Sequence, residues 1–202
     1  MEPRKVPLTG GCHCGATRYV LYFTLPAPHN ESNPNQKGDQ RIARCNCTTC
    51  HKMGLFHLTP ADAQDGFLLL SPLDPFTELG DYLAFDKEIH FFFCKTCGVR
   101  CFTYTGLGEV IDIDQATARE LPEAAKVGGV APTKAWRAIR GSGSPEFGTF
   151  INVNGHTIDA GQPEFDMREL TEKKCVRYLD TFSEWGKGMP SRWDRPQEHG
   201  CY

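Results

Sequence analysis

Cysteine clustering is the feature that most constrains what this chain can fold into. Seven of the ten cysteines fall into three short groups with the spacings C-x-C, C-x-C-x-x-C and C-x-x-C. The groups are Cys12 and Cys14; Cys45, Cys47 and Cys50; and Cys94 and Cys97. Thiols this close together along a chain form disulfides, carry out redox chemistry or bind a metal ion, and each use needs its own local geometry.

The amino-terminal residues bear on which of these uses applies. Pro3, Pro7 and polar side chains stand where a signal peptide needs an apolar stretch of about 7–15 residues. The densest apolar run, at 89–94, is far shorter than the roughly 20 residues that span a bilayer. We therefore expect a cytoplasmic protein with no membrane partner. Thiols stay reduced in that compartment, so the clusters indicate metal binding or catalysis before disulfides.

Length and charge exclude other classes of protein. A chain of 202 residues with 40% hydrophobic content can bury one core, which predicts a single domain over 1–202. Lysine and arginine total 22 against 25 acidic residues, a net charge of -3, and no stretch concentrates basic side chains. Nucleic acid is therefore not an expected partner.

The two outer cysteine pairs complete each other as a metal site. Structural zinc is tetrahedral and takes four thiolates, commonly two from each of two turns. Glycines flank both CHCG and CKTCG. We predict a structural zinc on Cys12, Cys14, Cys94 and Cys97, which would tie an amino-terminal turn to a central hairpin. The alternative is loop thiols without metal, or a redox pair.

The middle group, Cys45, Cys47 and Cys50, has an odd number of thiols. Three protein ligands leave the fourth position of a zinc ion open to a water, thiol or carbonyl, as catalytic zinc requires. The competing interpretations are a closed site completed by His51 or a distant residue, a redox sensor, and thiols without metal. His51 follows Cys50 directly, as a ligand, a general base or a polar residue of a turn.

Most of the remaining sequence favours short strands. Residues rich in β-branched and aromatic side chains predict strands over 17–25, 67–70, 82–85, 89–93, 99–104, 109–113 and 149–153. Helical patterns cover only 114–125 and 171–185. Proline, asparagine and glycine mark 26–40 as a loop and 141–148 as a flexible connection. The sequence predicts a mainly β domain with short peripheral helices.

Three cysteine-containing motifs follow one another along the chain: GCHCGATRYV at 11–20, CNCTTCHKMG at 45–54 and FFCKTCGVRCF at 92–102. In sequence and order they resemble the glutathione-dependent formaldehyde-activating enzymes, whose domain is shared with centromere protein V. The segment 151–159 is also similar to the closing strand and turn of family members. The likeness spans about the first 160 residues and leaves the last 40 or so without a family motif.

The resemblance implies a β-tent fold with two zinc ions per chain. One would be structural, on the four paired cysteines, and the other would be catalytic and more weakly held, on Cys45, Cys47 and Cys50. It also implies the joining of glutathione to formaldehyde to give S-hydroxymethylglutathione, formally a carbon–sulfur lyase run in reverse. The expected partners are thus a small thiol and a small electrophile. His51 or Lys52 would move the proton or hold a carboxylate of the thiol.

Departures from the family pattern leave other functions open. Val99 stands where a small hydroxyl residue is usual, and Cys101 where an aliphatic residue is common. The segments 26–40 and 126–148 are longer than a minimal member needs, and insertions beside a site often change its substrate. The first alternative is therefore a zinc lyase, cyclase or decarboxylase acting on a different small metabolite. The second is a non-catalytic interaction domain, although chromatin binding needs concentrated positive charge.

Overall fold

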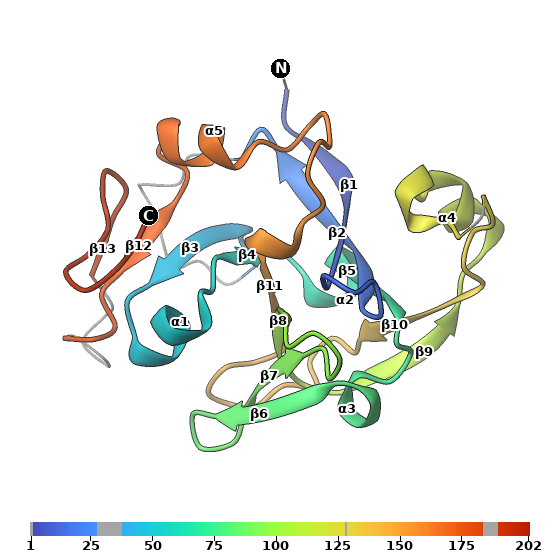
Figure 1. The fold of residues 1–202 in the computed structure, drawn as a ribbon, viewed down its shortest axis with the longest axis horizontal. Helices are drawn as coiled ribbons and strands as arrows, with labels where there is room; N and C mark the ends of the chain where they lie inside the picture. Colours follow the sequence, from blue (N-terminus) through green and yellow to red (C-terminus); the bar gives the residue numbers. More distant parts are fainter. Residues whose placement is uncertain (1, 28–37, 128, 184–189) are drawn as a thin grey trace.

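The strands of the molecule gather into two β-sheets (Figure 1). The computed structural model describes residues 2–27, 38–127, 129–183 and 190–202. The five-stranded sheet has the order β1 (Arg4–Gly11), β2 (Arg18–Leu25), β5 (Phe67–Ser71), β10 (Lys134–Ala138) and β9 (Gly108–Asp112). The eight-stranded sheet has the order β13 (Ser191–Arg192), β12 (Arg177–Leu179), β3 (Arg41–Cys45), β4 (His57–Thr59), β11 (Phe150–Asn154), β8 (Arg100–Thr105), β7 (Ile89–Phe93) and β6 (Gly80–Ala84).

The helices are short and lie at the periphery of the sheets (Figure 1). They are α1 (Thr48–Met53), α2 (Ala63–Gly66), α3 (Pro75–Glu78), α4 (Gln115–Glu120) and α5 (Met167–Glu172), with 3-10 turns η1 (Glu123–Ala125) and η2 (Gly155–Thr157). None of the helices described is long and apolar enough to cross a membrane. The predicted mainly β fold with short peripheral helices is confirmed, and its two-sheet arrangement is compatible with a β-tent.

The core lies between the two sheets. Alternating residues of β2, including Leu21 and Phe23, point into it, as period-two side-chain alternation requires. From the other sheet, Phe102 meets the ring of Phe67 with centroids 5.2 Å apart, and Phe67 in turn packs against Tyr19 at 5.3 Å. Full burial of each such side chain stabilises the fold by about 2–3 kcal/mol. The apolar side chains that make these segments recognisable as strands are therefore the same ones that pack the two sheets together.

The eight-stranded sheet also has a second, outer face. Leu58 and Ile151 belong to the core between the sheets, so their strand neighbours His57 and Phe150 point the opposite way. A separate apolar cluster gathers on that side around Leu55, Ile89 and Phe91. β3 ends at Cys45, which packs against this outer cluster, and α1 begins three residues later at Thr48.

The carboxyl-terminal prediction is wrong. Residues 171–185 do not form a helix over the part described: α5 ends at Glu172, and β12 follows at Arg177–Leu179. β12 runs parallel to β3, and Val176 and Tyr178 are buried in the core. Pairing with β3 thus outweighs a weak helical pattern. Residues 184 and 185, and residues 28–37 of the predicted 26–40 loop, lie outside the described residues.

Candidate metal centres

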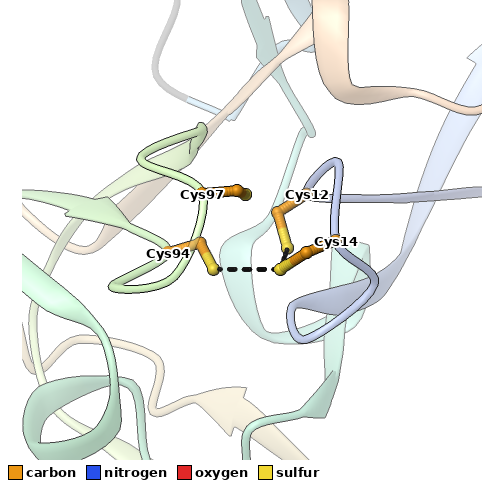
Figure 2. A group of neighbouring side chains, drawn as sticks. All are labelled: Cys12, Cys14, Cys94 and Cys97. Atoms are coloured by element: carbon orange, nitrogen blue, oxygen red, sulfur yellow. Dashed lines mark hydrogen bonds between the residues drawn. The ribbon is translucent and has the colours of Figure 1, made fainter.

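The first cysteine cluster joins turns from the two sheets. Cys12 and Cys14 lie between β1 and β2, while Cys94 and Cys97 lie between β7 and β8 (Figure 2). The four sulfur atoms all lie within 4.8 Å of one another. Cys14 Sγ is 3.5 Å from Cys12 Sγ and 3.6 Å from Cys94 Sγ. A tetrahedral zinc with four 2.3 Å bonds places its sulfurs about 3.8 Å apart, so this donor set fits such an ion.

Backbone geometry shapes both turns in the same way. In the first, the Cys12 N–H donates to the Thr17 carbonyl at 3.0 Å; in the second, the Cys94 N–H donates to the Val99 carbonyl at 3.0 Å. Gly15 and Gly98 follow the second cysteine of each pair with φ of +79° and +75°. Only glycine adopts this left-handed conformation without strain. The flanking glycines of CHCG and CKTCG therefore allow the tight return of each chain.

The four thiols are so close together that they can all ionise only if a cation compensates their charge. Burial opposes ionisation of Cys12, but hydrogen bonds from Thr17 outweigh it and lower the pKa of Cys12 to about 6. The amide of Ala16 favours a thiolate at Cys14, yet the neighbouring Cys12 and Cys94 raise the pKa of Cys14 to about 12. Like charges this close cannot all form on their own. A bound metal ion would supply the compensating charge.

The second cluster is built where β3 passes into α1. Cys45 is the last residue of β3, Cys47 is the N-cap of α1, and Cys50 lies in its first turn. Their three ligand atoms lie within 4.8 Å of one another. The Cys50 N–H donates to Cys47 Sγ at 3.4 Å, and the Cys47 N–H donates to Cys45 Sγ at 3.4 Å. The spacing C-x-C-x-x-C thus puts one thiol on the strand and two on the helix start, all facing one point.

Ionisation in this cluster is divided unequally. Hydrogen bonds from Cys45 and Cys50 lower the pKa of Cys47 to about 2. The same interactions with Cys45 and Cys47, together with burial, raise the pKa of Cys50. Cys47 therefore ionises readily, whereas the raised pKa values of Cys45 and Cys50 keep them protonated in the absence of a cation. Both clusters can therefore hold a metal ion, and thiolate donors suit soft and borderline metals such as zinc.

The carboxyl-terminal segment is part of the second site. Thr181 Oγ1 lies 2.7 Å from Cys45 Sγ. The buried Asn46 holds this segment in place: its Oδ1 accepts from the N–H groups of Thr181 at 2.8 Å and Phe182 at 3.0 Å, and its Nδ2 donates to Asp180 Oδ1 at 2.9 Å. Sequence reasoning missed Asn46 and Thr181, because nothing in the chain marks residues so far apart as neighbours.

A histidine contacts the second cluster, and it is His57. The Nε2 atom of His57 lies 3.2 Å from Cys50 Sγ. Burial lowers the pKa of His57 to about 4. His51, the candidate from the sequence, is exposed on α1, where its backbone N–H donates to the Cys47 carbonyl at 2.9 Å. A local signal for His57 exists in the alternation of Phe56-His57-Leu58-Thr59, which predicts a strand with His57 facing away from Leu58.

Half-buried aromatic rings belong to the same apolar group as the second cluster. Phe85, Phe147 and Phe150 pack against the apolar group that includes Cys50, Leu55 and Phe91. The Phe85 ring stacks on Phe91 at 6.2 Å between centroids. Cys45 and Cys47 are themselves partly buried against this apolar group, so the thiols and the rings share one surface.

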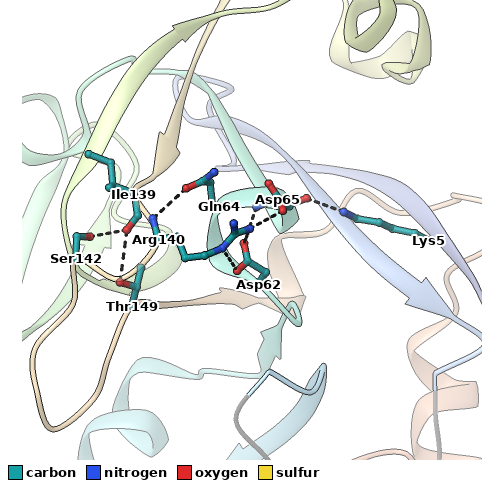
Figure 3. Close-up of polar contacts among 8 residues, drawn as sticks. All are labelled: Lys5, Asp62, Gln64, Asp65, Ile139, Arg140, Ser142 and Thr149. Carbon is teal, nitrogen blue, oxygen red and sulfur yellow. Dashed lines mark hydrogen bonds and ion pairs between the residues drawn. The ribbon is translucent and has the colours of Figure 1, made fainter.

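The loop that carries Phe147 is anchored by polar contacts (Figure 3). Ser142 Oγ donates to the Ile139 carbonyl at 2.6 Å, and the Gly143 N–H donates to Thr149 Oγ1 at 2.7 Å. Beside it, Arg140 pairs with two carboxylates of the α2 region. The connection predicted over 141–148 is thus a hydrogen-bonded turn.

Comparison with known proteins assigns no function. No protein-family model matches the sequence. Among solved structures, the chain is similar to a Rhodobacter sphaeroides protein whose crystal structure was a structural genomics target, with a TM-score of 0.39 and 17% sequence identity. The match covers 77% of this chain and 92% of that one.

Proposed function

We propose that this protein is a zinc-dependent enzyme of the carbon–sulfur lyase type, which adds a thiol such as glutathione to formaldehyde or another small aldehyde. The observation that carries the proposal is the separation of one cluster of four thiols from another of three. The set of four satisfies a tetrahedral ion, whereas the set of three does not. The motif order shared with the formaldehyde-activating enzymes supports the choice of reaction.

In this proposal, Cys45, Cys47 and Cys50 hold the reactive ion. A zinc ion with three protein ligands supplies, when bound, a position at which an incoming thiol ionises or a carbonyl is polarised. The reaction forms a bond between the thiol sulfur and the carbonyl carbon, and the thiol proton goes to the carbonyl oxygen. It needs no oxidant or reductant. His51 and Lys52, both exposed on α1, are candidates to carry that proton or to hold a carboxylate of the thiol.

The decisive experiment removes one thiol of the set of three. We expect Cys47→Ser to lower the bound zinc from two ions per chain toward one and to abolish turnover of glutathione with formaldehyde, while the circular dichroism spectrum is retained. The matched control is Cys201→Ser, because Cys201 is exposed and belongs to neither cluster. Metal content is measured by mass spectrometry and the hemithioacetal product, S-hydroxymethylglutathione, by NMR. Unchanged turnover in Cys47→Ser would remove the proposal.

A second candidate keeps the same metal site but changes the substrate. Phe85, Phe147 and Phe150 pack against the same apolar group as the three cysteines, which favours an apolar electrophile, acted on by a lyase, cyclase or decarboxylase. A panel of aldehydes of increasing apolar area separates the two candidates. Turnover of apolar aldehydes, without heat of glutathione binding in calorimetry, would favour the second.

A further inference from the structure

His57 reaches the second cluster through a chain reversal that follows α1. Gly54 ends the helix with φ of +62°, and the Leu55 N–H donates back to the Cys50 carbonyl at 3.0 Å. The chain then enters β4, in which His57 pairs with Ala43 of β3 and Asn154 of β11. The imidazole is therefore fixed by a strand between two others, and it returns to within 3.2 Å of the thiol seven residues earlier.

The position of the His57 ring distinguishes a direct ligand of the metal ion from a residue that hydrogen-bonds to one of the ligands. A fourth ligand to the same tetrahedral ion would lie about 3.6 Å from each of the three sulfurs. His57 is not part of the group whose ligand atoms all lie within 4.8 Å of one another. Within the part of the chain that the structure describes, its Nε2 lies at a hydrogen-bonding distance, 3.2 Å, from Cys50 Sγ. The ring nitrogen therefore lies more than 4.8 Å from at least one of the other two sulfurs, which is too far for a fourth ligand of the same ion.

We infer that His57 is a positioning residue for the second metal site, whose Nε2–H group donates to Cys50 Sγ. This inference rests on the proposed function only in that the second cluster must hold a metal ion. Three thiolates around a dication carry a net charge of about -1. A donor to one sulfur orients that ligand and withdraws negative charge from it, as outer-shell partners do. The fourth position stays available to a substrate.

The test replaces zinc with ¹¹³Cd in the full chain and follows one NMR resonance per site. In His57→Leu, which has no donor, we expect the second-site resonance to shift and the affinity of that site for the metal to fall 10–100-fold. His57→Gln, whose amide N–H restores a donor, is expected to keep most of the affinity. The resonance of the four-thiol site is an internal control, since it should not move in either variant. His90→Leu is the matched control: His90 lies on β7 and pairs with Asp81 at 2.7 Å.

Two results would overturn the inference. One is a His57→Leu protein with the wild-type resonance and affinity at the second site. The other is scalar coupling between ¹¹³Cd and the ring protons of His57, which would make it a direct ligand. A wild-type chain with only the four-thiol resonance would remove the proposed function as well, so the two failures are distinguishable without an activity assay.

Discussion

At the level of single residues, the two clusters differ in how their sulfurs are held. In the first cluster, Cys12 Sγ accepts from the Thr17 N–H at 3.1 Å within its own turn, although the cluster as a whole joins two turns about 80 residues apart. Cys45 instead meets Thr181, and Cys50 meets His57. The sequence could therefore predict all seven thiols and the glycine turns. It could not predict Thr181 or Asn46, whose positions depend on long-range packing.

The first residue-scale prediction concerns the set of four thiols. We expect Cys97→Ser to prevent folding, because structural zinc contributes on the order of 10 kcal/mol to the folding of small modules. Circular dichroism and soluble yield measure the effect, with the exposed Cys201→Ser as the control. A folded Cys97→Ser protein with a cooperative unfolding transition would contradict a structural role for this cluster.

The second residue-scale prediction concerns Asn46, which is 3% exposed and whose side chain hydrogen-bonds to Asp180, Thr181, Phe182 and Glu198 of the carboxyl-terminal segment. Asn46→Ala leaves buried N–H and carbonyl groups unpaired, so we expect a loss of about 2–3 kcal/mol in the free energy of unfolding. We also expect weaker metal binding at the second cluster. Urea denaturation measures the first effect, and Gln115→Ala, on the exposed start of α4, is the control. A loss equal to that of the control would contradict this role.

At the level of elements, the sequence predicts strands that are rich in β-branched and aromatic residues. It does not predict strands that form only because they pair with a neighbouring strand. The predictions over 17–25, 89–93 and 99–104 correspond to β2, β7 and β8. β1 carries Pro7 and two glycines, which argue against a strand, yet it pairs along its whole length with β2 at the edge of the sheet. Proline is tolerated at an edge because its missing N–H faces away from the partner.

The element-scale prediction concerns the link between α2 and the loop after β10. Arg140 donates to Asp62 at 2.8 Å and to Asp65 at 2.6 Å (Figure 3). We expect Arg140→Gln to lower the free energy of unfolding slightly, and the difference from wild type to shrink as salt rises, because exposed ion pairs are screened. Denaturation at low and high salt measures it. The control is Arg168→Gln, whose partner Asp166 is only two residues away. Equal salt dependence in both variants would contradict a link between elements.

At the level of the whole molecule, the two clusters differ in their position relative to the two sheets. The first joins the β1–β2 turn of the five-stranded sheet to the β7–β8 turn of the eight-stranded sheet (Figures 1 and 2). The second lies at the end of β3, on the outer face of the larger sheet. An ion bound by the first cluster would therefore join the two sheets, whereas an ion bound by the second would not touch the interface between them. Sequence spacing suggests this division but does not identify the two sheets.

The last prediction follows from that division. As a chelator is added, we expect the ion of the second cluster to leave first, because three protein ligands bind a metal ion with lower affinity than four. We expect little change in circular dichroism at that step. The ion of the first cluster should leave at higher chelator concentration and together with loss of the fold, since its removal frees the turns that join the sheets. A colorimetric metal assay and circular dichroism are recorded on the same sample. Release of both ions in one step, or a fold that survives the loss of both, would contradict the separate roles of the two clusters.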